Sequence, residues 1–365
     1  MTRPLTQIEP QPGIMEITPY KGGDAKLDGH EHVLKLSSNE NPFGPSQKAV
    51  EAVQRSAPTL NLYPSTDHRD LREAIARVFT VDANRVICGA GSDEILHLLC
   101  QTYAGPGDEI VYTEHGFSMY RILGLAAGAT PVKVPENNRM VDVDAILAGC
   151  NERTRIVFVT NPGNPTGTKI RDTELDRLAQ NIPPKALLVL DGAYAEFVPG
   201  FNGCAELVDA RENVVMTRTM SKIFGLGGMR VGWGYGPEHV IGALNRVRGP
   251  FNLSTPALVA AAAAIQDVDY TSFCQTENIR NREWLRVELA KHGVQSDPSH
   301  ANFILARFRD AEEAKGCDAY LRRNGIIVRQ VGGYGIPEGL RITIGDSSAC
   351  EKVAETIGEF LKVHS

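Results

Sequence analysis

The segment that decides the fold is Thr219-Met-Ser-Lys222-Ile-Phe-Gly-Leu-Gly-Gly-Met-Arg230. It follows the apolar run that starts at Asn213, which has the composition of a buried strand, so Lys222 stands just beyond a strand end. The hydroxyls of Thr219 and Ser221 and the guanidinium of Arg230 can bind a phosphate close to the lysine amine. This combination is what imine formation with a phosphorylated aldehyde cofactor requires. The alternative for Lys222 taken alone is a solvated charge.

Short apolar runs alternate with helix-like stretches on both sides of this segment. Continuous apolar strands separated by helices predict an α/β fold with a mostly parallel sheet and helices on both faces. The expected strands are Arg85–Cys88, Glu109–Tyr112, Arg155–Val159, Ala186–Leu190, Asn213–Thr217 and Arg230–Tyr235. In such a sheet the ligand site lies at the carboxyl ends of the strands, so the polar residues that follow these strands should converge.

The pattern changes after about residue 265. A long helical stretch at 279–289 precedes strand candidates at 301–308, 326–329 and 340–344, and a helix closes the chain. We expect three parts: an N-terminal arm at 1–35 that partly joins the small domain, a large domain at 36–268, and a small α+β domain at 269–365.

Composition excludes several functions for the 365 residues. The net charge of −6 and the absence of Lys/Arg blocks argue against nucleic acid and against an anionic membrane as partners. No apolar run has the length of a membrane span, and the first residues lack the apolar core of a secretory signal. Seven scattered cysteines indicate reduced thiols in a cytoplasmic protein, and nine histidines without metal-ligand spacing predict no metal site.

Two strand ends carry groups suited to an aromatic nitrogen heterocycle. Asp191 ends a buried-looking strand, and a carboxylate there needs a cationic or hydrogen-bonding partner such as a protonated pyridine nitrogen. Tyr194 could reach a ring hydroxyl, and so could the amide of Asn164 in the stiff Asn161–Gly167 turn. The alternatives are a helix N-cap for Asp191, a half-buried tyrosine, and plain turn geometry.

The Gly89-Ala-Gly91-Ser92-Asp93-Glu94 segment joins a strand to a helix, so free backbone N–H groups and the helix dipole can hold a phosphate. A dinucleotide fingerprint is the competing interpretation. Glu94 occupies the position of its third glycine, which makes a nicotinamide oxidoreductase the weaker alternative.

Three further side chains lie beside predicted strands. Phe117 could stack on an aromatic ring or simply pack in the core. Arg329 and Arg341 stand in apolar surroundings, where a guanidinium needs an anion such as a carboxylate or phosphate, unless they occupy solvated edges.

These residues, in this order, resemble the fold-type-I pyridoxal-phosphate (PLP) aminotransferases, and nearly the whole chain takes part in the resemblance. Within them the chain is similar to the histidinol-phosphate aminotransferase family. The motifs that carry the narrower resemblance are Ile17–Tyr20, Leu36–Gly44, Leu62–Pro64, Gly91–Glu94, Thr219–Lys222, Arg248–Asn252 and Leu340–Thr343. The resemblance implies a seven-stranded, mostly parallel sheet in the large domain.

The resemblance also implies roles in catalysis and in cofactor binding. Lys222 would form the Schiff base with PLP and move protons, Asp191 would pair with the ring nitrogen, and Tyr194 and Asn164 would contact the ring oxygen. Phe117 would stack on the ring, where the family usually has tyrosine. The phosphate contacts would be Gly91, Ser92, Asp93, Thr219, Ser221, Arg230 and, from a neighbouring subunit, Tyr63.

For substrate the resemblance implies contacts from Arg341, with help from Arg329, Tyr20, Asn41, Tyr63 and Asn164. The expected reaction is transamination of L-histidinol phosphate with 2-oxoglutarate in histidine biosynthesis, by a homodimer that shares its active sites. Alternatives on the same fold are an aromatic or broad-specificity aminotransferase and a threonine-phosphate decarboxylase. A non-catalytic PLP-binding regulator would need a DNA-binding module that the sequence does not offer. Gly192 departs from the family, which often has glutamate there.

Overall fold

The computed structural model describes residues 8–19 and 22–364. Its main body, here the large lobe, is built on a seven-stranded sheet in the order β2-β8-β7-β6-β5-β3-β4. All neighbouring strands run parallel except β8, which is antiparallel to both β2 and β7. The strands are β2 (Val86–Gly89), β3 (Glu109–Thr113), β4 (Thr130–Val134), β5 (Thr154–Thr160), β6 (Leu187–Asp191), β7 (Val214–Thr219) and β8 (Gly232–Tyr235).

Both faces of this sheet are buried, as its apolar sequence predicts. In β5, Ile156 and Phe158 belong to the apolar cluster on one face, whereas Val157 and Val159 belong to the cluster on the other. Side chains alternate across a strand, so a strand covered on both sides is apolar over most of its length. The predicted α/β fold with a mostly parallel seven-stranded sheet is confirmed. The predictions omitted the edge strand β4, whose Thr-Pro-Val-Lys-Val sequence is only partly buried and gives a weak signal.

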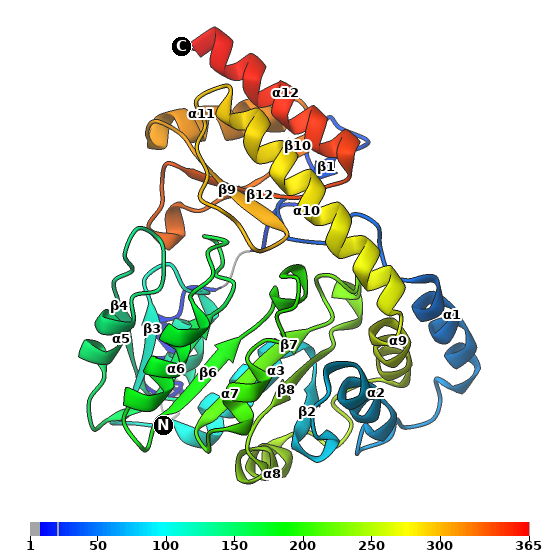
Figure 1. Cartoon of the computed structure of the whole chain (residues 1–365), viewed down its shortest axis with the longest axis vertical. Helices are drawn as coiled ribbons and strands as arrows, with labels where there is room; N and C mark the ends of the chain where they lie inside the picture. The colour runs from blue at the N-terminus through cyan, green and yellow to red at the C-terminus, as the bar shows by residue number, and fades with distance from the viewer. Residues whose placement is uncertain (1–7, 20–21, 365) are drawn as a thin grey trace, which may run out of the picture.

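Helices cover the sheet on both sides (Figure 1). Ser46 and Asp142 begin two of them by accepting hydrogen bonds from first-turn N–H groups. The helices up to the lobe boundary are α1 (Gln47–Ser56), α2 (Arg69–Phe79), α3 (Gly91–Tyr103), α4 (Met119–Ala126), α5 (Val143–Gly149), α6 (Asp172–Asn181), α7 (Ala205–Asp209), α8 (Glu238–Val247) and α9 (Thr255–Ile265). Short 3₁₀ turns are η1 (Ile14–Glu16), η2 (Ala57–Thr59), η3 (Ala83–Arg85), η4 (Ala195–Phe197) and η5 (Gly227–Met229).

A second body, here the small lobe, has its own apolar core around an antiparallel sheet in the order β11-β12-β9. Its elements are β9 (Phe303–Arg307), α11 (Ala311–Arg323), β10 (Ile326–Ile327), β11 (Arg329–Gln330), η6 (Gly332–Tyr334), β12 (Gly339–Thr343) and α12 (Ser347–His364). The early strand β1 (Leu34–Lys35) pairs in parallel with β10, and Leu36 packs in the same core. An N-terminal segment therefore forms part of the small lobe.

The long helix α10 (Val268–Ala290) connects the two bodies (Figure 1). Cys274, near its start, packs in the large-lobe core, whereas Leu285 and Leu289 pack in the small-lobe core. The predicted boundaries of the three parts, 1–35, 36–268 and 269–365, stay a prediction.

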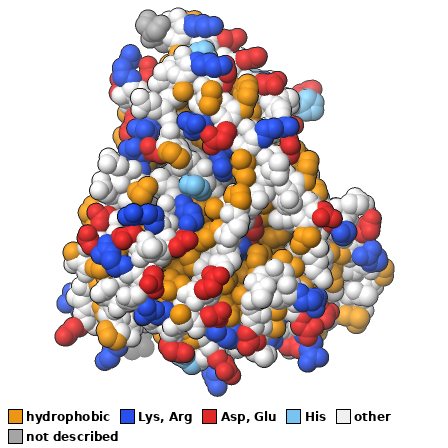
Figure 2. Space-filling model, in the orientation of Figure 1, with side chains coloured by type: hydrophobic (Ala, Val, Ile, Leu, Met, Phe, Trp, Pro, Cys, Tyr) orange, Lys and Arg blue, Asp and Glu red, His pale blue; other side chains and the backbone are white. Residues whose placement is uncertain are grey.

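Charged side chains of both signs are mixed over the face seen in Figure 2. None of the helices described is long and apolar enough to cross a membrane.

Candidate active site

A cavity of about 330 Å³ opens where the sheet meets the small lobe. Ligand pockets for small molecules start at about this size. Its lining combines strand ends of the large lobe with β11, η6 and β12 of the small lobe. The lining residues are Gly22, Gly23, Ser37, Ser38, Asn39, Ser92, Asp93, Phe117, Thr160, Asn164, Asp191, Ala193, Tyr194, Thr219, Ser221, Lys222, Arg230, Arg329, Tyr334 and Arg341.

Most of the predicted site residues therefore meet in one place. A larger hollow of about 560 Å³ lies between α1, α2 and α9, but it is lined by none of the predicted residues. Chemistry rather than size identifies the candidate site.

Lys222 lies just beyond β7, half-buried in this cavity. Its Nζ donates to the carbonyl oxygen of Ser38 at 3.4 Å and lies 5.9 Å from the centre of the Tyr194 ring. Burial, and secondly the positive charge of Arg341, lower the pKa of Lys222 to about 8. At pH 7 such an amine is neutral in about a tenth of the molecules, far more than an ordinary lysine, so it can act as a nucleophile.

Asp191 is the last residue of β6 and only 3 % exposed. Its carboxylate accepts from the Tyr120 hydroxyl at 2.8 Å, the Ala193 N–H at 3.2 Å and the Thr217 hydroxyl at 3.4 Å. Burial raises the pKa of Asp191 to about 6, although the hydrogen bond from Tyr120 opposes this rise. Within the described residues no Lys, Arg or His forms an ion pair with it, so the site fits a ligand that brings its own positive charge.

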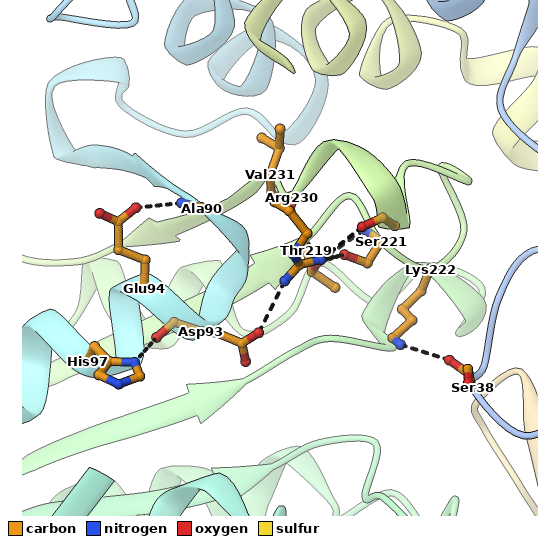
Figure 3. A network of polar contacts seen from close by, with 11 residues as sticks. Ser38, Ala90, Asp93, Glu94, His97, Thr219, Ser221, Lys222, Arg230 and Val231 are labelled. Atoms are coloured by element: carbon orange, nitrogen blue, oxygen red, sulfur yellow. Dashed lines mark hydrogen bonds and ion pairs between the residues drawn. The ribbon is translucent and has the colours of Figure 1, made fainter. Parts of the chain in front are cut away.

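The groups predicted to hold a phosphate form one connected cluster (Figure 3). Arg230 donates to the Ser221 hydroxyl at 3.1 Å and pairs with the Asp93 carboxylate at 3.2 Å. Thr219 donates to Ser221 at 3.0 Å. Gly91 begins α3 with a φ of +79°, and a Cβ there would lie 2.6 Å from Arg230 Nη2. Glycine therefore leaves room for the guanidinium beside the N–H groups of the first turn, which is an anion-binding arrangement.

Two predicted donors face the cavity in defined orientations. The Tyr194 hydroxyl accepts a hydrogen bond from Asn39 Nδ2 at 2.9 Å, and burial raises the pKa of Tyr194 to about 12, so it keeps its proton. The Asn164 Oδ1 accepts from Arg341 Nη1 at 2.6 Å, which leaves the Asn164 NH₂ group to donate. Phe117 also lines the cavity and packs edge-on against Tyr120.

The two predicted arginines lie side by side, because Arg329 in β11 is the register partner of Arg341 in β12. Arg341 is 6 % exposed and also donates to the Ser37 carbonyl oxygen at 2.7 Å. Both line the cavity from the small lobe, where they can bind an anionic substrate group.

Two of the predicted substrate contacts, Asn41 and Tyr63, do not line this cavity, and a third cannot be placed. Asn41 does not line it, because its NH₂ group donates to the Ile223 carbonyl oxygen at 2.6 Å and its Oδ1 accepts from the Phe43 N–H. Tyr63 is 82 % exposed and stacks on Phe251, and within its own chain it does not line the cavity. Tyr20 lies outside the described residues.

Other residues of the site escaped the prediction: Asn39 and Thr160 line the cavity, and Tyr120 lies behind Asp191. Asn39 stands two positions before Asn41 in the same motif, and a single sequence gives no means of choosing between the two. Tyr120 supports Asp191 from α4, and Thr160 accepts or donates a 2.6 Å bond with the Tyr120 hydroxyl. These contacts depend on tertiary packing and leave no local signal.

Gly192, the departure noted after Asp191, has a local explanation. A Cβ at this position would lie 3.0 Å from Arg218 Cδ and 3.1 Å from the Thr217 carbonyl oxygen. Arg218 is itself buried, ion-paired with Glu196 at 2.9 Å. Glycine at position 192 therefore leaves room for the Arg218 side chain next to Asp191.

Comparison with known proteins identifies the family to which the chain belongs. The family model "Aminotransferase class I and II" matches residues 31–357. The chain belongs to this aminotransferase family. It is 60 % identical over 356 residues to a histidinol-phosphate aminotransferase of Ruegeria sp., with 98 % of each chain covered. It is 58 % identical to that of Paracoccus denitrificans, covering 99 % of this chain and 98 % of the relative.

A solved structure agrees with the family assignment. The histidinol-phosphate aminotransferase of Sinorhizobium meliloti, in complex with pyridoxal-5'-phosphate, superposes with a TM-score of 0.87. It is 26 % identical, and the match covers 92 % of each chain. The aminotransferase family thus accounts for the fold and for the amine-bearing cavity together.

Proposed function

We propose that this aminotransferase transfers the amino group of L-histidinol phosphate to 2-oxoglutarate in histidine biosynthesis, with PLP as cofactor. The products are imidazole-acetol phosphate and L-glutamate. The observation that carries the proposal is the single cavity that joins Lys222, the buried Asp191 and the cationic pair Arg329 and Arg341. Relatives that are 58 % and 60 % identical bear the name histidinol-phosphate aminotransferase.

The cavity fits PLP at both of the cofactor's charged ends. Bound PLP supplies an electron sink that stabilises negative charge at the substrate Cα. Asp191, buried among neutral donors, would hold the ring nitrogen. The phosphate would lie on Arg230, Ser221 and the start of α3, whose geometry leaves a cradle beside Gly91.

Lys222 performs the proton transfers. Its Nζ would be the amine that holds PLP in the cavity, and the same nitrogen would serve as the base once substrate is bound. The lowered pKa of Lys222, about 8, lets Nζ accept a proton from Cα near neutral pH and return it on the other side of the transfer. Tyr194 and Asn164 would hold the phenolic oxygen of the ring, and Phe117 would pack against the ring from the cavity wall.

Arg341 and Arg329 bind the anionic group of each substrate in turn. A guanidinium pair is suited to the phosphate of histidinol phosphate and to the carboxylate of glutamate. Threonine phosphate and amino acids with aromatic side chains also carry anions that this pair could bind. They are therefore the competing substrates, for a decarboxylase and for an aromatic or broad-specificity aminotransferase.

One experiment separates these functions. The absorption spectrum of the purified protein is recorded before and after addition of histidinol phosphate, and again with phenylalanine and with threonine phosphate. A PLP band that changes first and fastest with histidinol phosphate supports the proposal, with turnover measured as glutamate formed from 2-oxoglutarate. Faster turnover of phenylalanine, or release of carbon dioxide from threonine phosphate, would assign a rival function, and the absence of any PLP band would refute PLP chemistry.

We further propose that the enzyme is a cytoplasmic homodimer in which Tyr63 completes the partner's active site. Tyr63 is 82 % exposed and its ring stacks on Phe251. Leu60 and Leu62, its neighbours in the sequence, are also exposed. Together these side chains form an apolar surface suited to a second copy of the chain. All seven cysteines are unpaired thiols, which suits a reducing compartment.

Mixing two inactive variants tests the shared site. In a dimer of Tyr63→Ala with Lys222→Ala, one of the two sites combines Lys222 of one subunit with Tyr63 of the other and is intact. Activity should therefore appear when the two variants are denatured and refolded together, and not when each is refolded alone. Failure of the mixture to exceed the separate variants would place Tyr63 outside the site.

A further inference from the structure

Asn39 is a buried residue between the lobes with every polar group engaged. It is 1 % exposed and has a φ of +55°, a conformation that asparagine and glycine tolerate best. Its N–H donates to Thr343 Oγ1 at 2.9 Å, and its Oδ1 accepts from the same hydroxyl at 3.0 Å. Its Nδ2 donates to the Tyr194 hydroxyl at 2.9 Å, and its carbonyl oxygen accepts from Asn302 at 3.0 Å.

These contacts form a chain with one direction. Because the Thr343 hydroxyl accepts from the Asn39 N–H, its own proton goes to Asn39 Oδ1. This fixes the amide, so the NH₂ group must face Tyr194. The Tyr194 oxygen is then an acceptor toward Asn39, and its proton is directed elsewhere, toward the cavity that Tyr194 lines.

The same strand orients the other donor. Arg341 lies two positions before Thr343 in β12, so both side chains are on one face of the strand. Arg341 donates to Asn164 Oδ1 and turns the Asn164 NH₂ group away from itself. β12 of the small lobe thus determines the direction of two hydrogen-bond donors that belong to the large lobe.

We propose that Asn39 is a positioning residue that fixes Tyr194 as a hydrogen-bond donor to the phenolic oxygen of PLP, with its own direction set by Thr343. This inference depends on the proposed function, because it requires PLP in the cavity. A donor to the phenolic oxygen draws negative charge away from Lys222 Nζ in the loaded enzyme. Nζ then holds its proton less tightly, so loss of the donor should raise the pH at which the PLP band shifts.

Other charges act on Lys222 and stay constant in the test. Arg341 faces it from β12, Asp93 from α3, Arg230 from beyond η5, and Glu40 from the segment that follows Asn39. None of them is altered by the variants below.

The test is a spectroscopic pH titration of the PLP-loaded enzyme and its variants. Asn39→Gly keeps the left-handed backbone and removes the amide, and it should raise the midpoint by about one pH unit, as expected for one lost charge-assisted hydrogen bond. Asn39→Asp should raise the midpoint further, because the carboxylate accepts a hydrogen bond from the Tyr194 hydroxyl, which then no longer donates to PLP, and because it adds a negative charge. Tyr194→Phe should reproduce the rise seen with Asn39→Gly.

A double variant separates positioning from a merely structural role. If Asn39 acts through Tyr194, then Asn39→Gly adds no further shift in a Tyr194→Phe background. At Thr343 the isosteric Val variant should raise the midpoint, whereas Ser, which keeps the hydroxyl, should restore the wild-type value. Thermal unfolding of each variant establishes that it is folded.

The possible failures are distinguishable. An absent PLP band in the wild-type protein would overturn the proposed function itself. A normal band with an unchanged midpoint in Asn39→Gly and Asn39→Asp would overturn this inference alone. Additive shifts in the double variant, or equal behaviour of Val and Ser at position 343, would also overturn it.

Discussion

Replacing Asp191 by asparagine should stabilise the cofactor-free protein at pH 8 and strongly reduce the activity of the PLP-loaded enzyme. The carboxylate is 3 % exposed and surrounded by neutral donors, so its charge is costly until a cation arrives. An asparagine can be accommodated, because its oxygen can accept from the Ala193 N–H while its NH₂ group donates to the Tyr120 hydroxyl. That hydroxyl can then turn its proton to Thr160.

The magnitude follows from the pKa of Asp191, raised by burial from 3.8 to about 6. Between about pH 4 and pH 6 the folded protein holds a proton that the unfolded chain has lost, so its free energy of unfolding falls as the pH rises. The charge on Asp191 therefore lowers the free energy of unfolding by about 3 kcal/mol at pH 8 and by about half of that at pH 5. The stability gained by Asp191→Asn should therefore be about 1.4 kcal/mol larger at pH 8 than at pH 5.

The assay is urea unfolding of both cofactor-free proteins at the two pH values. Comparing the stability change caused by Asp191→Asn at pH 8 with that at pH 5 removes any effect of the new amide that does not depend on pH. Asp28→Asn, the same change at an exposed turn, serves as the matched control. With PLP added, Asp191→Asn should lose at least about a hundred-fold in kcat, because a buried ion pair is worth 3 kcal/mol or more when one partner is removed. Equal gains at both pH values would refute the view that Asp191 is held as a costly charge.

Three further changes probe the rest of the site. Lys222→Ala should abolish turnover while equilibrium dialysis still finds PLP bound through its phosphate, and turnover near the wild-type rate would disprove the role of the amine. Arg230→Leu should weaken PLP binding by about 10- to 100-fold, the equivalent of one charge-assisted hydrogen bond, and unchanged affinity would remove the guanidinium from the phosphate site. Tyr120→Phe removes the 2.8 Å hydrogen bond to Asp191, so a rise of about one unit in the pKa of that carboxyl should weaken PLP binding about fivefold at pH 6 and little at pH 8. Parallel binding curves at the two pH values would contradict this last expectation.

The sheet was predictable because its central strands are mostly apolar, and polar residues of the site stand at or just beyond the ends of several of them. Asp191 ends β6 and Lys222 lies just beyond β7, and parallel strands place their carboxyl ends at one edge. That geometry alone brings the two residues to one cavity. The edge strand β4 gave no comparable signal, because two of its five residues are exposed and only one is fully buried.

The contacts that orient these groups were not predictable from one sequence. Asn39 and Asn41 stand in the same motif, yet only Asn39 reaches the cavity, because its left-handed backbone conformation turns it toward Tyr194. Tyr120 carries no motif of its own and becomes relevant only where α4 packs against the end of β6. Local composition predicts which chemistry is present, whereas hydrogen-bond direction depends on segments that are distant along the chain.

The dependence of two donors on β12 has a consequence for biosynthesis of the protein. Lys222, Asp191 and the phosphate cradle are all synthesised more than a hundred residues before Thr343. Chains fold progressively from the N-terminal side as they emerge from the ribosome. A nascent chain can therefore form the large-lobe groups that would bind PLP early in synthesis. It can align Tyr194 and Asn164 only after β12 has emerged and paired with β9 and β11.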